Sequence, residues 1–293
     1  MKLTPPLVLD FSVEIRLSVA QRRQIQRAIR TLQQTAHCPL QSTLWQLAHS
    51  RRYNRKRGCL RQLEHELSAH AVEIKRGSPD PGPRLDQIQA ASQVEQAVLH
   101  AHQANLWAAC CGDDFANFCS ALEACGTAMT GQQTVIRSRE IATVADVNGR
   151  RWQYLAASAV QPNLQMLHQL CRKLVTLPAE TAKRREVSIH QFTLAVRIFA
   201  MLLAIHPFTD GNGRVARALL HSLLQGVGIL RGHYLPLREC FDLADYGQEI
   251  RLRHFDLTGD YVDLALFFGR VITAYSVMTR SALKQPRRAS RHP

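Results

Sequence analysis

Residues 206–217 gather, in one short stretch, the residue types that polyphosphate chemistry requires. They read His-Pro-Phe-Thr-Asp-Gly-Asn-Gly-Arg-Val-Ala-Arg. His206 can act as a general base, because an imidazole is partly neutral at physiological pH and accepts a proton. Gly211 and Gly213 flank Asn212, so the backbone can turn with its N–H groups pointing inward and form an anion-binding nest. The stretch therefore predicts an anion site beside a base.

The sequence on either side predicts the elements that hold this loop. Residues 189–205 are almost continuously apolar, which indicates a central buried helix. Pro207 ends that helix, since the residue before a proline is disfavoured in the α region. A second helix, predicted over 215–226, starts after the nest, and the positive end of its dipole adds to the anion site. Arg214 and Arg217 are three positions apart and so face one side of this helix.

Asp210 directly precedes the nest, where its carboxylate would repel a phosphate. A divalent cation between the two removes the repulsion, and Mg²⁺ is the natural mediator because it prefers oxygen ligands. The alternative is an ordinary connection between two helices, with turn-forming residues and solvated arginines. We favour the chemical interpretation because base, carboxylate, nest and arginines converge within one loop.

The loop resembles the signature of the Fic (fido) family, H-P-F-x-[D/E]-G-N-G-R-x-x-R, and matches it at every specified position. A looser resemblance extends over residues 85–283. It implies a mainly α bundle with one β-hairpin flap and the activity of a protein adenylyltransferase. Such an enzyme moves AMP from ATP to a Tyr, Thr or Ser hydroxyl of a target protein and releases pyrophosphate. His206 would be the general base, and Asp210 would hold Mg²⁺ against the nucleotide.

The resemblance also implies roles for the other residues of the loop. Gly211, Asn212 and Gly213 would cradle the phosphates and stabilise the charge that develops at the α-phosphate. Arg214 and Arg217 would bind the outer phosphates.

Other functions remain open at the level of the sequence. Relatives of this family transfer UMP, phosphocholine or a terminal phosphate, although the phosphate-transferring relatives carry lysine where this chain keeps Gly213. A different class is a module that binds nucleic acid or a protein partner and has a vestigial loop. A third is a toxin–antitoxin or secreted-effector role with the same chemistry. The intact loop favours the enzyme.

A candidate inhibitory element lies upstream at residues 91–96. Many family members carry a helix with the pattern [S/T]-x-x-x-E-[G/N], whose glutamate pairs with the second arginine of the signature. Glu95 is present here, but Ala91 replaces the hydroxyl residue and Gln96 replaces Gly or Asn. The resemblance therefore implies an encounter between Glu95 and Arg217, and the alternative is an exposed glutamate on an amphipathic helix.

Residues 134–155 predict the one β-hairpin of the chain. β-Branched residues precede Asn148 and Gly149, a pair that supplies the positive φ angles of a type I′ turn. In the family, a hairpin beside the active loop aligns the target segment by edge pairing. The target protein would then dock on 134–155, unless the hairpin only covers the domain.

Elsewhere the apolar spacing predicts helices, so the fold class is mainly α. The predicted helices are 18–34 with Ser18 as N-cap, 44–67, 85–109, 113–130, 163–174 and 261–283.

Residues 76–83, rich in proline and glycine, are the best linker candidate. We therefore expect a basic helical N-terminal region over 1–78, a Fic-type domain over 85–283 and a basic tail over 284–293.

Composition limits the setting in which this chain works. The chain has 293 residues, 46% of them hydrophobic, which is enough for one sizeable core. Its net charge of +14 favours acidic partners such as ATP, although basic runs are usually solvated and we expect no nucleic-acid partner. Eight cysteines without zinc-ligand spacing fit a reducing cytoplasm. We expect neither a signal peptide nor a membrane span, and the oligomeric state stays open.

Overall fold

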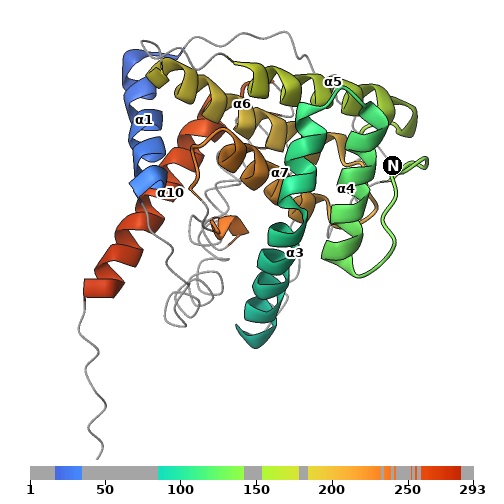
Figure 1. Cartoon of the computed structure of the whole chain (residues 1–293), viewed down its shortest axis with the longest axis horizontal. Helices are drawn as coiled ribbons and strands as arrows, with labels where there is room; N and C mark the ends of the chain where they lie inside the picture. Colours follow the sequence, from blue (N-terminus) through green and yellow to red (C-terminus); the bar gives the residue numbers. More distant parts are fainter. Residues whose placement is uncertain are drawn as a thin grey trace, which may run out of the picture.

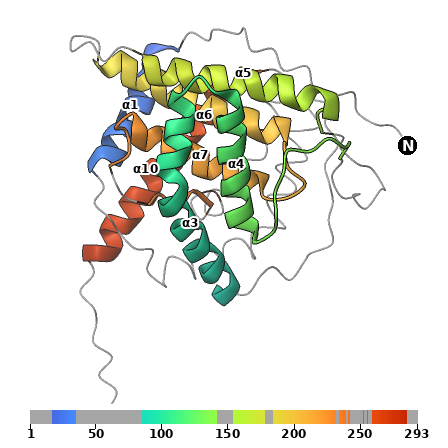
Figure 2. The same ribbon diagram turned by 45° about the vertical axis from the view of Figure 1, so that its right-hand side comes forward.

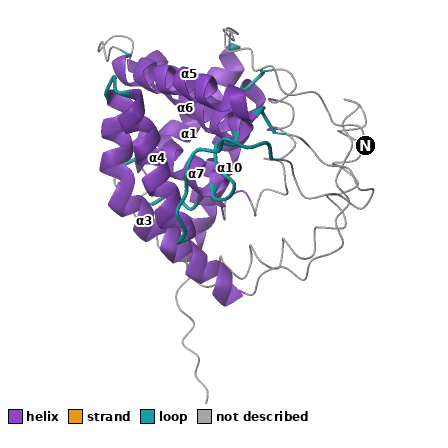
Figure 3. Ribbon diagram, turned by 90° about the vertical axis from the view of Figure 1, so that its right-hand side faces the viewer, coloured by secondary structure: helices purple, strands orange, loops and turns teal. Residues whose placement is uncertain are grey.

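A computed structural model describes residues 17–34, 85–141, 154–177, 184–231, 234–238, 241, 252, 255 and 259–284. Seven helices have bounds within these ranges: α1 (Val19–Gln34), α3 (Leu85–Cys111), α4 (Phe115–Thr130), α5 (Ala157–Thr176), α6 (Arg184–Ile205), α7 (Asn212–Gly226) and α10 (Val262–Lys284). The described part contains helices and loops but no strand (Figure 3). The predicted mainly α class is confirmed.

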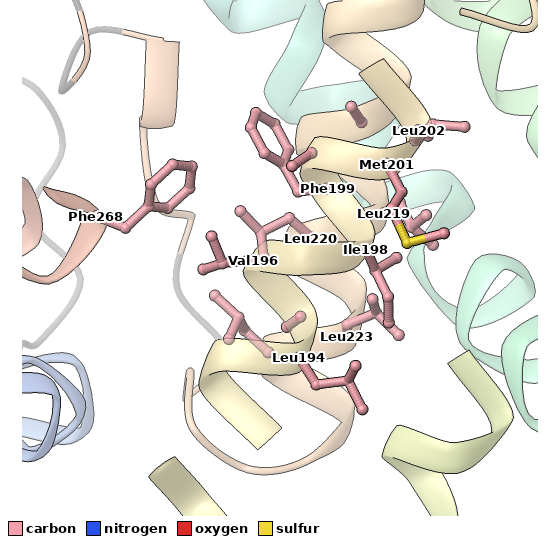
Figure 4. Close-up of a cluster of buried hydrophobic side chains, with 14 of the residues drawn as sticks. Leu194, Val196, Ile198, Phe199, Met201, Leu202, Leu219, Leu220, Leu223 and Phe268 are labelled. Carbon is pink, nitrogen blue, oxygen red and sulfur yellow. The ribbon is translucent and has the colours of Figure 1, made fainter. Parts of the chain in front are cut away.

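Helix α6 forms the centre of the molecule, as its apolar sequence predicts. Its side chains are buried over most of its length, and Figure 4 shows Ile198 and Leu202 among the leucines of α7. On the α10 side, the rings of Phe199 and Phe268 meet edge to face with their centroids 5.3 Å apart. The core therefore fixes α6 and α7, and with them the loop that joins the two helices.

The segment Val187–Ile205 of α6 is long and apolar enough to cross a membrane by length and composition alone. Of that segment, 78% is buried inside the protein. Such burial is typical of the core helix of a globular domain.

Helices α3 and α4 run side by side below α5, and both pack against α7 (Figures 1 and 2). The contact between α3 and α7 depends on Gly226, because a Cβ atom there would lie 2.1 Å from the indole ring of Trp107. This close approach places α3 beside the helix that follows the loop.

Helix α1 lies along α10 and also contacts α6 (Figure 1). Ser18 caps it as predicted: its Oγ accepts from the N–H of Gln21 at 3.2 Å, and its own N–H donates to the Gln21 side chain at 2.8 Å. Ile25, Ile29 and Leu32 are buried in the same core as the helices beyond residue 85. The predicted helix 44–67 and linker 76–83 lie outside the described residues, so the division into domains stays a prediction.

Three helices begin earlier than the sequence predicts, and one of them is α6, which starts at Arg184 rather than at 189. Helix α7 starts at Asn212 rather than 215, so the second half of the nest is also the first turn of the helix. Helix α5 starts at Ala157 rather than 163, because its first N–H donates at 2.8 Å to Glu140, which lies 17 positions away along the chain. Local spacing does not reveal a cap of this kind.

The predicted hairpin lies mostly outside the described residues, including its turn at 148–149. Its described ends, 134–141 and 154–155, form no strand. The N–H of Tyr154 donates to the carbonyl oxygen of Ile141 at 3.2 Å, so the two ends lie side by side. The hairpin itself stays a prediction.

Candidate active site

His206 follows the last residue of α6 in a conformation that is rare for a side-chain-bearing residue. Its φ is 50°, the left-handed region, which costs on the order of 1–3 kcal/mol and persists only where the surroundings enforce it. Pro207 has no N–H, so it cannot donate to the carbonyl of Leu203 as the next helical residue would. The Nδ1 atom of His206 takes that place, 3.3 Å from the Leu203 oxygen.

This contact assigns the tautomer of His206. A carbonyl oxygen only accepts hydrogen bonds, so Nδ1 carries the proton. In the neutral ring Nε2 then has the lone pair and is the atom that can accept a proton. The geometry suits the predicted general base.

The loop after the histidine is closed by the side chain of Asn212. Its Oδ1 accepts from the N–H of Phe208 at 2.9 Å, and its Nδ2 donates to the Phe208 carbonyl at 2.7 Å. The ring of Phe208 is fully buried and anchors the loop in the core. Because the amide side chain of Asn212 is used in this way, its backbone N–H is the group that could meet a phosphate.

Gly211 makes the turn into α7. Its φ is 83°, and a Cβ atom there would lie 2.8 Å from the Cγ2 methyl of Thr130. Its N–H donates to Oδ1 of Asp210 at 2.6 Å. Among the described residues, none accepts from the N–H groups of Asn212 and Gly213, the first two of the helix. These two donors and the helix dipole could bind an anion, which is the arrangement that the sequence predicts.

Arg214 is held at the mouth of this site. Its guanidinium donates to the carbonyl of Met129 at 2.7 Å and to Oδ2 of Asp210 at 2.8 Å. The side chain of Arg214 is 33% exposed and that of Asp210 is 78% exposed. Both therefore remain reachable from solvent.

Arg217 is bound to Glu95 of α3 by two parallel hydrogen bonds. Nε donates to Oε1 and Nη2 donates to Oε2, each at 2.7 Å. The pair is largely withdrawn from water, with side-chain exposures of 14% for the arginine and 6% for the glutamate. Two-pronged pairing of this kind is the strongest geometry an arginine offers to a carboxylate. Glu95 is therefore not the exposed surface glutamate of the alternative interpretation.

One pocket of about 590 Å³ joins these groups. Its lining includes all the predicted site residues: Glu95, His206, Asp210, Gly211, Asn212, Gly213, Arg214 and Arg217. Its volume lies within the range of small-molecule sites. Residues that the sequence placed on separate helices thus face one cavity.

The residues present fit a magnesium ion held jointly with a nucleotide. The described residues contain no group of three His, Cys, Asp or Glu side chains that could hold a metal alone. Mg²⁺ usually binds through one or two carboxylates together with substrate phosphates and water. Asp210 supplies one exposed carboxylate directly beside the anion site, which is the donor set this mode requires.

The pocket also contains Arg238, which sequence reasoning missed. It follows the signature by 21 positions, and no local signal identifies it. Arg137 and Tyr154 were missed as well, although both contact His206. Their contacts depend on the tertiary fold.

A model of the Fic/DOC family matches residues 128–224, which run from the end of α4 through the loop into α7. Residues 128–224 therefore form a Fic/DOC family segment. The Fic domain indicates transfer of a nucleotidyl or phosphoryl group to proteins, and family members are typically transferases that use a nucleotide and Mg²⁺.

Solved structures of Fic proteins are similar to this chain at low identity. Fic-1 (residues 134–508) from C. elegans is 15% identical, with 90% of this chain and 73% of that chain covered and a TM-score of 0.46. A variant of the same fragment gives 17% identity, the same coverages and a TM-score of 0.46. A Fic-domain-containing signaling protein from Bacteroides thetaiotaomicron is 15% identical, with coverages of 89% and 97% and a TM-score of 0.43. No curated protein matches the sequence.

Proposed function

We propose that this Fic protein transfers AMP from ATP to a hydroxyl side chain of another protein and is held in check by Glu95. The observation that carries the proposal is the shared pocket, in which a histidine of defined tautomer faces a helix N-terminus, a carboxylate and two arginines. A helix N-terminus with adjacent arginines suits a polyphosphate, and the histidine suits a nucleophile that must lose a proton.

In the proposed reaction, Nε2 of His206 accepts the proton of the target hydroxyl. The oxygen forms a bond to the α-phosphorus of ATP, the bond from that phosphorus to the bridging oxygen breaks, and pyrophosphate leaves. Backbone N–H groups of Asn212 and Gly213 stabilise the negative charge that develops on the non-bridging oxygens. His206 then carries the proton, which passes to solvent or to product.

Asp210 and Arg214 handle the remaining phosphates. Asp210 would hold Mg²⁺ together with the nucleotide, and the ion would supply positive charge to offset that of the leaving pyrophosphate. Arg214 swings from its pair with the exposed Asp210 to the leaving pyrophosphate, while its bond to the Met129 carbonyl keeps the guanidinium nearby. The target segment docks against residues 134–155.

Glu95 restrains the reaction through Arg217. The edge of the guanidinium that carries Nε and Nη2 is occupied by the carboxylate and is not offered to an outer phosphate. ATP therefore binds without its full set of contacts until α3 moves or Glu95 is removed.

Transfer of AMP is favoured over transfer of a terminal phosphate, because Gly213 places no side chain and no positive charge at the helix N-terminus. A Cβ atom there would lie 3.5 Å from Nη1 of Arg217, so a longer side chain would extend beside the outer-phosphate arginine. With glycine, the backbone itself can approach the α-phosphate.

Labelled nucleotides test the proposal directly. The purified protein, and its Glu95→Gly form, are incubated with Mg²⁺, a cell lysate and ATP labelled at either the α- or the γ-phosphorus. We expect label on protein from the α-position only, and a loss of about 10²- to 10⁴-fold with His206→Ala at unchanged ATP affinity.

Other labels distinguish the alternatives. Transfer from γ-labelled ATP would indicate phosphorylation, and transfer from α-labelled UTP or from labelled CDP-choline would indicate UMP or phosphocholine. If no label is transferred from any donor by either form of the protein, the enzymatic proposal is wrong.

A further inference from the structure

Arg137 is a buried arginine that binds the active loop without lying in the pocket. Its residue is only 5% exposed, and it belongs to the segment 134–141 at the base of the predicted flap. All its described acceptors are main-chain carbonyls on three separate segments. The backbone N–H donates to Pro207 at 2.8 Å, Nε to His206 at 2.8 Å, Nη1 to Arg139 at 3.0 Å, and Nη2 to Ile205 at 3.3 Å and to Leu155.

These contacts satisfy the end of α6. The last carbonyls of a helix have no N–H partner within the helix and carry the negative end of its dipole. Pro207 adds to the deficit because it has no N–H. Arg137 supplies both the positive charge and donors in a fixed planar fork, which lysine cannot reproduce.

Tyr154, on the other arm of the flap, contacts the imidazole itself. The two rings are stacked with centroids 3.7 Å apart and planes inclined by 14°. Tyr154 is tied to the first arm by its N–H bond to Ile141. One arm therefore holds the backbone of His206 and the other holds its ring.

We propose that Arg137 and Tyr154 are positioning residues for the general base. Arg137 keeps His206 in its left-handed conformation by binding its carbonyl and that of the next residue, and Tyr154 fixes the plane of the ring. Together they keep Nδ1 on the Leu203 carbonyl, so that Nε2 presents its lone pair to the pocket. The inference rests on the proposed role of His206 as base.

A second consequence is that the described ends of the predicted flap are joined to the base. The hydrogen bonds of Arg137 join both flap ends, at Arg139 and Leu155, to the backbone of the catalytic histidine. If a target segment docks on the predicted flap, these bonds would relate its position to that of His206.

The first test compares two conservative substitutions of buried arginines. Arg137→Lys keeps the charge and loses the fork, and Arg197→Lys is the matched control on α6, where Arg197 is also buried and lies 5.1 Å from the centre of the Tyr261 ring. For Arg137→Lys we expect kcat to fall about 10²-fold, the scale of a misplaced catalytic group, with the KM for ATP nearly unchanged. Arg197→Lys leaves both constants near wild type.

The second test does not require activity. In ¹⁵N-histidine-labelled protein, with His206→Gln used for assignment, long-range proton–nitrogen spectra report which ring nitrogen of His206 carries the proton. We expect Nδ1–H in the wild type and in Arg197→Lys, and a mixture of tautomers in Arg137→Lys. Tyr154→Leu, which removes the stacked ring at a half-buried position, gives the same mixture and keeps the test open if Arg137→Lys does not fold.

The outcomes separate this inference from the proposed function. If the variants fold with wild-type kcat and an unchanged His206 signal, Arg137 and Tyr154 are structural only and the inference is overturned. The same holds if they lose thermal stability while the His206 signal stays as in the wild type. If neither the wild type nor Glu95→Gly transfers label, the proposed function is refuted, and the tautomer measurement would still decide the inference.

Discussion

Glu95 and Arg217 lie 122 positions apart in the sequence and form a two-pronged ion pair across the pocket. The pair joins α3 to α7 at the point where the outer phosphates of a nucleotide would bind. Both partners are largely buried, so screening by solvent weakens it less than a surface pair. The arginine is thereby committed to the protein rather than to a ligand.

Replacing Glu95 by glutamine should activate the protein. The amide keeps the shape of the side chain but loses the charge that holds the guanidinium, so Arg217 can turn to the nucleotide. We expect the rate of AMP transfer at fixed ATP to rise about 10- to 10²-fold. This gain is smaller than the change in rate that a charged contact to the transition state can produce. Incorporation of α-labelled ATP measures it.

The control for this prediction is the same substitution in an Arg217→Ala background. Without the arginine, Glu95→Gln should add nothing, because the two residues act through one contact. An equal gain in both backgrounds would show that Glu95 acts elsewhere.

Asp210→Asn should make transfer depend on much higher magnesium concentrations. An amide oxygen is a weaker ligand than a carboxylate, and we expect the half-saturating Mg²⁺ concentration to rise about tenfold or more. A titration of transfer rate against Mg²⁺ measures the shift. Thr209→Ala, in the neighbouring exposed residue of the same pocket, is the control and should leave the titration unchanged. An Asp210→Asn curve that overlays the wild type would remove Asp210 from the metal site.

The sequence was sufficient to predict the parts of the site that depend on local geometry. Neighbouring residue types account for the end of α6 before Pro207 and for the turn at Gly211. They also account for the placement of Arg214 and Arg217 on one side of the same helix. The loop residues could therefore be assigned before any tertiary contact was known. Glu95 could be named only as a candidate, because both residues that flank it in the family pattern differ here.

The contacts of Arg137 and Arg238 could not be predicted in the same way. The acceptors of Arg137 include carbonyls almost 70 positions away, and a carbonyl leaves no trace in the residue type that bears it. Arg238 reaches the pocket only because the chain returns to it after α7. The early start of α5 has a similar cause, since its cap comes from Glu140. Each of these features depends on packing between distant segments.

Gly211→Ala should destabilise the fold for two separable reasons. The added methyl group must adopt φ near 83° and would lie 2.8 Å from Cγ2 of Thr130. The left-handed backbone alone costs about 1–2 kcal/mol, and the clash adds about 1–3 kcal/mol. Urea unfolding measures the sum.

Thr130→Ser supplies the control for this prediction. Serine lacks Cγ2 but keeps the hydroxyl that bonds the carbonyls of Gly126 and Gln132 at 2.9 Å. In that background Gly211→Ala should lower the free energy of unfolding only by the cost of the left-handed backbone. A loss of the same size in both backgrounds would show that the methyl contact is harmless.

Alkaline pH should destabilise the protein through its buried thiols. Burial, and secondarily the charge of Glu95, raises the pKa of Cys125 to about 12. An unfolded thiol titrates near pH 8.5. The contribution of the Cys125 thiol to the free energy of unfolding is therefore fully present below about pH 8.5. It is lost as the pH rises toward 12, because the unfolded state releases its proton first. Cys125→Val should flatten the fall of the unfolding free energy over this range, and an unchanged slope would contradict the assignment.

Asn212→Ala should cost stability because the side chain closes the loop from Phe208. Removing the amide leaves the N–H and carbonyl of Phe208 buried without their partner, at about 1–3 kcal/mol for each stranded group. Ser222→Ala on the same helix is the matched control, since Ser222 is equally buried and no described residue bonds its hydroxyl. It should cost much less in urea unfolding. ATP binding should weaken in Asn212→Ala alone, because only that change frees the loop that presents the helix N-terminus. If both variants lose the same free energy of unfolding, burial of the side chain sets the cost, and the closing of the loop does not.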